Sequence, residues 1–349
     1  MFLLTCCHTF GLSEDTKEDK EYVVNTGHKG KIFAVRTDAS RNIIVSGGED
    51  GTIQVWDGLT LKPKTILRLS NLSIRKIALH PELPQVAVIE SDNISIFTLS
   101  VWDYERKKKL FSIALNELPL FLEYSPAGSF ILYSRADWKS LQFVNSQDGR
   151  LLPYLSQGFG IVTSAFLSQS EKTIVTYSPS GSIQYWDIQG ESRKADFVTN
   201  QDLDAITYMQ NGVSMVAANK ESILHIELVG KRNKDRLRVI SSIPLRNVLY
   251  TAIVSQNEVA VVSFSETTTI YLWNLQSTYL RKVETNKPLP AKPTSLGYMS
   301  GRLFLSFENG TIAAVDTASG QLEFFANHTL IDIDDATING GTIMLSSNE

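Results

Sequence analysis

The sequence predicts an all-β fold, a β-propeller built from four-stranded antiparallel blades. Three observations predict it: an ending that recurs along the chain, short strand-like runs within each repeat, and the lack of any stretch with a convincing helical period. The recurring endings, of which SGGEDGTIQVWD is the clearest, close at Asp57, Asp103, Asn145, Asp187, Leu228, Asn274 and Asp316. They are spaced by 41 to 46 residues, which is the period of a propeller blade.

The first repeat shows the strand pattern inside one period. The runs KIFAVRT, NIIVSGG and TIQVWD are separated by turn-forming residues at 38–40 and 49–51. Similar triplets of runs lie near residues 74–103, 120–145, 161–187, 204–229, 249–274 and 294–316. The sequence therefore predicts seven complete blades.

The two ends of the chain leave the closure of the ring open. If outer strands pass from one repeat to the next blade, the run at 22–24 is the candidate for the closing strand, because closure removes exposed strand edges. Two further strand-like runs follow LEFFA at 322–326, so the termini either combine into an eighth, composite blade or belong to a longer protein. We divide the chain into an N-terminal segment (1–20: a closing strand, an export-signal remnant or disorder), the propeller (21–325) and a partial further blade or closing strands (326–349).

Composition indicates an ordinary globular protein and disfavours nucleic acid as a partner. The chain is 43% hydrophobic and 20% charged, and its formal net charge is −4, whereas nucleic-acid binders usually carry a basic excess. The only cysteines, Cys6 and Cys7, are adjacent and cannot staple the fold. The apolar start is too short for a membrane span, so we expect a cytoplasmic location, with export and lipid anchoring at Cys6 as the alternative if the true start lies upstream.

The first repeat resembles the WD40 family, since Gly27-His28 precedes it and Trp56-Asp57 closes it. The resemblance implies a buried, hydrogen-bonded tetrad formed by His28, Ser46, Asp50 and Trp56. Four such side chains can be buried in one blade only if they satisfy one another. We therefore assign them a structural role. The other repeats share the period but depart from the motif, as at Ser180 and Asn274.

The sequence offers no catalytic signature. Five histidines are scattered without metal-ligand spacing, and no phosphate-binding loop or nucleophile elbow is present. We expect no enzyme activity, no cofactor and no metal. The alternative is an exported propeller that assembles an enzyme or ligand site in its central channel.

Four residues on loops are the candidate interaction surface: Arg135, Trp138, Phe159 and Arg246. Aromatic and arginine side chains on exposed loops are typical interface anchors, and we expect these four on one face of the ring. Two basic turns, at 105–109 and 231–238, are expected on the opposite face, where weak contact with an anionic surface is an alternative to plain solvation.

The sequence thus favours a non-catalytic scaffold for protein–protein interaction, with partners whose identity the chain does not reveal. A sensor or regulatory module of a larger protein is the first alternative, because the last repeat is unfinished.

Overall fold

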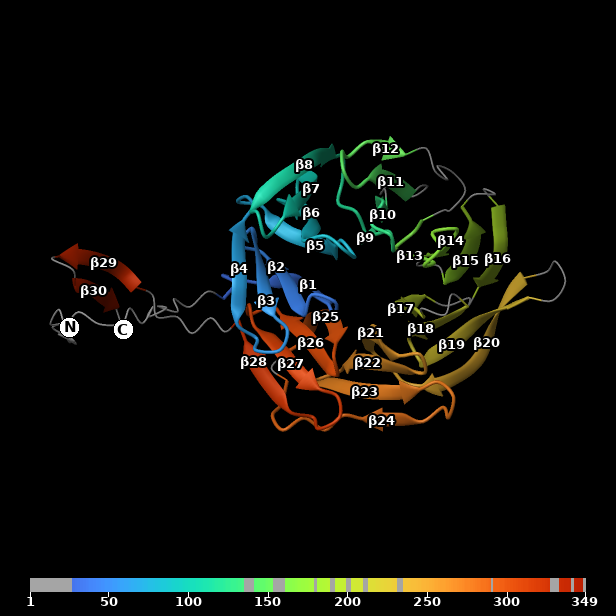
Figure 1. Cartoon of the computed structure of the whole chain (residues 1–349). Helices are drawn as coiled ribbons and strands as arrows, with labels where there is room; N and C mark the ends of the chain where they lie inside the picture. Colours follow the sequence, from blue (N-terminus) through green and yellow to red (C-terminus); the bar gives the residue numbers. More distant parts are fainter. Residues whose placement is uncertain are drawn as a thin grey trace.

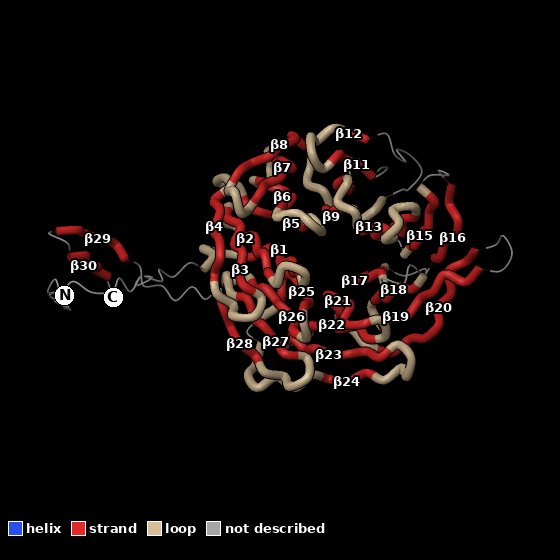
Figure 2. Tube along the Cα trace, in the orientation of Figure 1, coloured by secondary structure: helices blue, strands red, loops and turns tan. Residues whose placement is uncertain are grey.

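The computed structural model describes residues 27–134, 141–152, 161–178, 181–188, 192–198, 202–209, 213–230, 235–289, 291–326, 333–339 and 342–347, the last two segments by their backbone alone. Strands and loops make up these residues, with no helix among them (Figure 2). The predicted all-β class is confirmed.

Seven four-stranded antiparallel sheets stand as blades around a ring (Figure 1). The first four blades, in chain order, are blade 1 with β1 (Ile32–Asp38), β2 (Ile43–Gly48), β3 (Thr52–Asp57) and β4 (Pro63–Arg68); blade 2 with β5 (Ser73–Leu79), β6 (Gln85–Ser91), β7 (Phe97–Asp103) and β8 (Lys108–Leu115); blade 3 with β9 (Leu122–Tyr124), β10 (Phe130–Ser134), β11 (Leu141–Asn145) and β12 (Leu151–Leu152); and blade 4 with β13 (Ser164–Leu167), β14 (Thr173–Tyr177), β15 (Ser182–Asp187) and β16 (Ser192–Val198).

The remaining blades follow the same order. They are blade 5 with β17 (Leu203–Tyr208), β18 (Ser214–Asn219), β19 (Ser222–Gly230) and β20 (Asp235–Pro244); blade 6 with β21 (Val248–Ser255), β22 (Glu258–Phe264), β23 (Thr268–Asn274) and β24 (Leu280–Lys282); and blade 7 with β25 (Pro293–Met299), β26 (Arg302–Phe307), β27 (Ile312–Asp316) and β28 (Leu322–Phe325). The seven predicted triplets correspond to the three inner strands of the seven blades.

The recurring Asp or Asn at the end of the third strand caps the turn into the outer strand. In blade 1 the Asp57 carboxylate accepts the backbone N–H groups of Leu59 and Thr60, at 3.0 and 2.8 Å. The same pair of bonds, to the residues two and three positions later, is made by Asp103, Asn145, Asn274 and Asp316. Because a short polar side chain satisfies these amides and fixes the turn, the repeat keeps Asp or Asn there.

The hydrophobic core lies between the blades rather than inside them. Seven apolar clusters occupy the seven junctions, each shared by two neighbouring blades. Every blade is therefore covered on both faces, and its second strand is almost wholly buried, as in β2, β10 and β18. This explains why those strands read as continuous apolar runs instead of alternating ones.

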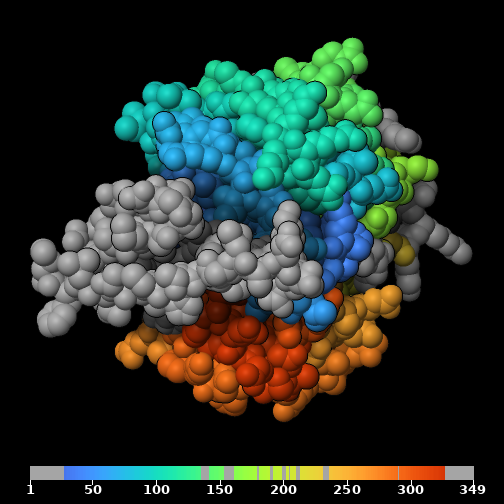
Figure 3. All heavy atoms as spheres, turned by 60° about the vertical axis from the view of Figure 1, so that its left-hand side comes forward, coloured from blue at the N-terminus to red at the C-terminus, as the bar shows by residue number. Residues whose placement is uncertain are grey.

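Within the described residues the ring closes by packing, and no strand is exchanged between the first and last blades. Each sheet uses four consecutive strands. β28 fills the outer position of blade 7, which the sequence analysis had given to an N-terminal strand if outer strands pass from one repeat to the next blade. The segment at 22–24 lies outside the described residues. Blades 1 and 7 share an apolar cluster, and the Thr294 hydroxyl donates to the Ile32 carbonyl at 2.6 Å. The two ends of the ring, blue and red, lie side by side in Figure 3.

The two strand-like runs predicted beyond blade 7 are present as a hairpin. β29 (Ile333–Asn339) and β30 (Thr342–Ser347) pair antiparallel with each other in a two-stranded sheet of their own. The described strands therefore form seven complete blades, and no eighth four-stranded blade is found among them. The N-terminal strand that would have completed one lies outside the described residues.

Candidate interaction surface and central channel

The ring has two loop faces with different contents. One carries the turns between second and third strands and the connections from one blade to the next; we call it the connection face. The other carries the turns between first and second and between third and fourth strands; we call it the turn face. Because every sheet is an antiparallel meander in the same order, each type of turn stays on one face around the ring.

Of the four predicted interaction residues, the structure describes one. Arg246 is exposed on the connection between β20 and β21, on the connection face, as expected. Arg135, Trp138 and Phe159 lie outside the described residues, so their grouping with Arg246 stays a prediction.

A loop that the sequence analysis missed presents apolar side chains on the same face. It joins β6 to β7, and its Ile94 is 84% exposed, with Ile96 exposed beside it. The Asp92 carboxylate accepts the backbone N–H groups of Ile94, Ser95 and Ile96 at 2.8 to 2.9 Å. These bonds hold the pKa of Asp92 well below its usual range. The backbone of this loop is therefore held in place by Asp92, while the apolar side chains of Ile94 and Ile96 stay exposed to solvent.

A shallow groove borders this region between blades 2 and 3. It has a volume of about 200 Å³, and its lining includes Leu115, Pro119, Ser134 and Leu151. Leu120, on the same connection, is exposed, and its backbone N–H donates to the Ser134 hydroxyl at 2.7 Å. An exposed apolar loop, β6–β7, therefore lies on the connection face of blade 2, and a shallow groove lies beside it at the border with blade 3.

The described basic turn lies on the turn face, as predicted. Residues 105–109, which form the turn after β7 and the first two positions of β8, are all exposed. Arg106 pairs with Asp103 at 3.8 Å, and the Lys109 ammonium lies 5.0 Å from the centre of the Trp102 ring. Part of this charge is thus already partnered within blade 2. Residues 231–234 of the second basic turn lie outside the described residues, whereas Arg236 and Arg238 are exposed on β20.

The structure brings the four tetrad residues together. The imidazole of His28 is fully buried, with Nε2 2.8 Å from the Ser46 hydroxyl and Nδ1 3.1 Å from the Asp50 carboxylate. The indole N–H of Trp56 donates to the same Ser46 oxygen at 2.9 Å. A consistent assignment lets Nδ1–H donate to Asp50 while Nε2 accepts from Ser46. All four polar groups then have partners.

The tetrad is held further by the loop around it. Burial by itself would raise the pKa of Asp50, but hydrogen bonds from His28 and Thr52 and from the backbone N–H of Lys29 outweigh it and lower the pKa to about 2. The ring of Trp56 packs edge-on against Phe325 at 5.3 Å, across the junction of blades 1 and 7. The tetrad therefore lies where the ring closes.

The first strand of every blade lies nearest the centre of the ring (Figure 1). Three charged side chains from three of these strands interact across the channel: Arg36 on β1, Lys76 on β5 and Glu123 on β9. Arg36 Nη2 lies 3.6 Å from Glu123 Oε1, and the two side chains are 36% and 41% exposed to the channel. The enclosing strands nevertheless desolvate the carboxylate and raise the pKa of Glu123, against the opposing effect of Arg36 and Lys76.

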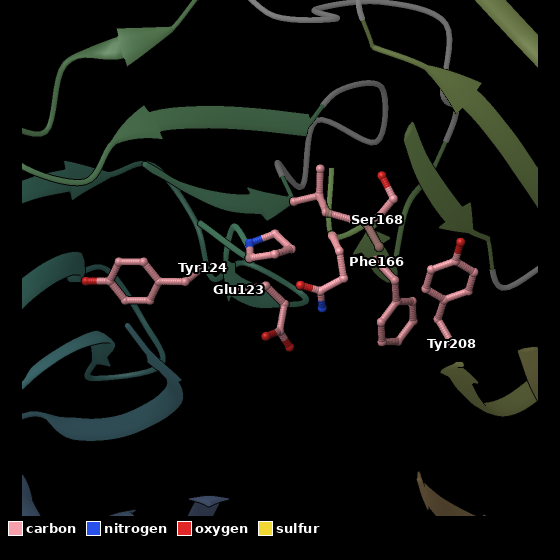
Figure 4. A pocket seen from close by; sticks show the side chains of 9 residues that line it. Glu123, Tyr124, Phe166, Ser168 and Tyr208 are labelled. Carbon is pink, nitrogen blue, oxygen red and sulfur yellow. The ribbon is translucent and has the colours of Figure 1, made fainter. Parts of the chain in front are cut away.

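Three hollows open along this channel. One, of about 470 Å³, is lined by Lys76 and by residues of β13, β17 and β21. Another, of about 700 Å³, reaches the turn face beside Gln169, Gln256 and Tyr298. The third, of about 200 Å³, lies between β9 and β13; Figure 4 shows Glu123 and Tyr124 pointing in different directions from β9, with Phe166 and Tyr208 side by side across the hollow.

The described part of the chain contains neither a metal-binding cluster nor a membrane-spanning helix. Its His, Cys, Asp and Glu side chains form no group of three that could hold a metal ion. No helix suited to crossing a membrane occurs in those same residues.

Comparison with known proteins places the chain among propellers. A family model described as an N-terminal beta-propeller domain, TP_0598_N, matches residues 7–322. An uncharacterized protein of Treponema pallidum is 21% identical over 274 residues, 78% of this chain and 43% of that protein. The match to the peroxisomal targeting signal 2 receptor of Schizosaccharomyces pombe is 30% identical and covers 31% of this chain and 34% of the receptor.

A third relative is the guanine nucleotide-binding protein subunit beta of Arabidopsis thaliana, 35% identical over 75 residues, which are 21% of this chain and 20% of that protein. The chain thus spans less than half the length of these relatives. The family match covers all seven blades found in the structure, from β1 to the start of β28. The chain belongs to this family of N-terminal beta-propeller domains.

Proposed function

We propose that this propeller is a non-catalytic scaffold of WD40 ancestry that binds a protein partner through its connection face. The observation that carries the proposal is the β6–β7 loop, which exposes 84% of Ile94 from a backbone fixed by Asp92. An exposed apolar side chain favours burial in an interface. Because the loop is already ordered, binding does not have to supply the free energy of ordering it.

The hydrogen bonds of two of the three described histidines, His28 and His80, support a structural rather than a catalytic use of these side chains. Both ring nitrogens of His28 are hydrogen-bonded within the tetrad, to Asp50 and Ser46. The Nδ1 atom of His80 accepts the backbone N–H groups of Glu82 and Leu83, at 3.1 and 3.0 Å, and so caps a turn. A histidine whose ring nitrogens are fixed in this way is poorly placed to exchange protons with a substrate.

The relatives support a recognition role and WD40 ancestry. One is named as a receptor for a targeting signal and another as a subunit of a nucleotide-binding protein, so both names describe proteins that act with another molecule. The tetrad of blade 1 adds to the similarity, since its residues occupy the positions that the WD40 resemblance implies.

The test uses the full chain as bait in affinity capture with mass spectrometry, followed by calorimetry with the purified partner. Ile94→Asp should weaken binding about tenfold or more, because a charge replaces an apolar anchor. Leu59→Asp is the matched control: Leu59 is 69% exposed two residues after a turn-capping aspartate, but it lies on the turn face.

Two results would contradict the proposal. If Leu59→Asp abolishes binding while Ile94→Asp binds normally, the turn face is the working face. If no stoichiometric protein partner is captured under any condition and a small-molecule turnover is found instead, the scaffold assignment is wrong.

A second proposal, that the propeller serves as the sensor or regulatory module of a larger protein, is favoured by the family description as an N-terminal domain and by the 43% coverage of the Treponema pallidum relative. Reading the gene beyond Glu349 tests it: an effector domain in the same reading frame is expected, and an immediate stop would contradict it.

A further inference from the structure

The wall of the central channel differs in character from one side to the other. On blades 1 and 2, Arg36, Arg75 and Lys76 bring three cationic groups to β1 and β5. Across the channel, β13 and β21 contribute the hydroxyl-bearing residues Ser164 and Thr251 to the same hollow as Lys76. The facing wall thus carries hydroxyl groups, whereas the wall of blades 1 and 2 carries more cations than the single Glu123 carboxylate beside Arg36 can match.

The three cations on blades 1 and 2 differ in the groups that they contact. Arg36 faces Glu123 at 3.6 Å. Arg75 lies over the Phe33 ring, 3.9 Å from its centre, and is attracted by Glu49. Lys76 makes no hydrogen bond or ion pair with a described residue. Burial and repulsion by both arginines lower its pKa, and the attraction of the more distant Glu123 carboxylate opposes them without outweighing them. A partly buried ammonium group that contacts no carboxylate is stabilised when an anion joins it.

The hollow around Lys76 has the size and lining of a small-ligand site. Its volume of about 470 Å³ lies within the usual range for ligand pockets. Apolar side chains of Leu203, Ile206 and Leu249 line it together with hydroxyl groups, and no carboxylate is among its lining residues. Within the described residues, the Ser164 hydroxyl has no hydrogen-bond partner and is available to donate to a ligand.

We propose that this hollow binds the oxyanion group of a small solute, a carboxylate or a phosphate, between the Lys76 ammonium and the Ser164 hydroxyl. Lys76 is the central residue of the seven-residue β5. Three residues separate it from each end of the strand, so its depth below either face of the ring is about 10 Å. An acidic side chain of a docked protein is too short to reach that depth, whereas a small solute can enter the channel. The inference is independent of the proposed protein-binding function, which uses the connection face.

The experiment is calorimetric titration of the full chain with inorganic phosphate and, separately, with acetate, at constant ionic strength maintained with chloride. We expect saturable one-to-one binding of at least one probe, and the preferred probe identifies the phosphate or carboxylate class. Lys76→Met should weaken that binding about tenfold or more, because it removes a charge-assisted hydrogen bond while keeping the shape of the side chain.

Two further variants separate a site from a general charge effect. Lys76→Arg keeps the cation and should retain measurable binding, and it also controls for misfolding of the methionine variant. Lys109→Met removes an exposed lysine on β8, outside the channel, and should bind as the wild type does. Absence of saturable binding to the wild type, normal binding by folded Lys76→Met, or equal loss in Lys109→Met would each overturn the proposal.

Discussion

The indole N–H groups of three tryptophans have three different surroundings, which explains why one blade alone carries the tetrad. In blade 1 Trp56 pairs with Ile44, and Ser46, two residues further along β2, accepts its N–H. In blade 6 Trp273 pairs with Val259, so Val261 stands at the position equivalent to Ser46 and offers no acceptor.

Blade 2 satisfies its tryptophan by another route. Trp102 donates to the Ser100 hydroxyl on its own strand at 2.9 Å, and Ser100 in turn donates to the buried carboxyl group of Glu90. Packing of the indole between blades is therefore the common requirement, while its hydrogen-bond partner differs from blade to blade.

Replacing Asp50 by Ala tests the structural role of the tetrad. The change removes the carboxylate acceptor from Nδ1 of the buried His28 and leaves the Thr52 hydroxyl as its neighbour, which should cost on the order of 1 to 3 kcal/mol in the free energy of unfolding. Urea unfolding followed by fluorescence measures it. Asp202→Ala, at an exposed position directly before β17, is the control and should change stability by no more than about 0.5 kcal/mol. Equal stabilities of the two variants would contradict the assignment.

Acid should remove the contribution of Asp50 in a defined pH window. The folded protein lowers the pKa of Asp50 from 3.8 to about 2, so the carboxylate form is favoured by folding. Its contribution, roughly 2 kcal/mol, is complete above pH 4 and is lost as the pH falls from about 4 to 2. The stability difference between the wild type and Asp50→Asn should therefore shrink across this window. A difference that stays constant down to pH 2.5 would contradict the prediction.

Turns are the elements on which the candidate surface depends. Asp92 accepts three consecutive amides and fixes the β6–β7 loop, just as Asp57 fixes the β3–β4 turn with two. Both are local devices, independent of the packing between blades.

Asp92→Ala should loosen the β6–β7 loop without unfolding the ring. The amides of Ile94, Ser95 and Ile96 lose their acceptor, so their hydrogen exchange should become faster. Nuclear magnetic resonance measures this residue by residue, and the amides of Leu59 and Thr60 serve as the internal control. Unchanged exchange in the loop would show that the carboxylate does not order it.

The sequence predicted the strands better than the surface. Third-strand endings were recognisable because Asp or Asn caps the next turn in blade after blade. The exposure of Ile94 was not predicted, because it depends on which parts of the fold cover the loop. The spacing of apolar residues along the sequence carries no information about that coverage. The channel cluster was missed for a related reason: Arg36, Lys76 and Glu123 stand singly on three strands and meet only when the ring forms.

At the scale of the molecule, the sequence predicted seven blades but not how the ring closes. The period does not say whether the outer strand of the last blade comes from the start or the end of the chain. The turn after β27 decides it: Asp316 caps two amides, and Gly320 adopts a positive φ of 73° where a Cβ would meet the Glu284 carbonyl. The chain therefore folds back locally and supplies β28 itself.

Phe325→Ala should weaken the junction of blades 1 and 7 selectively. Phe325 is buried against Trp56 and Phe304, and truncating a buried phenylalanine costs about 3 to 5 kcal/mol. Hydrogen exchange with mass spectrometry should show faster exchange in β1–β4 and β25–β28 than elsewhere. Phe143→Ala, at the junction of blades 3 and 4, should shift the faster exchange to those blades. A uniform increase in both variants would mean that the ring unfolds as one unit.

Among the described residues, side-chain packing and side-chain hydrogen bonds join blade 7 to blade 1, and no pair of strands is shared between the two blades. Seven blades in a circle share seven junctions, and separating blade 7 from blade 1 would leave six junctions and every strand ladder intact. The lost contacts are those of one nearest-neighbour interface, as in a linear repeat array, and in the described part of the chain no backbone pairing between the two blades has to break. A force that pulls the first and last blades apart would therefore spread the gap before it unravels a sheet, and the gap could widen the channel for a solute too large for the closed circle.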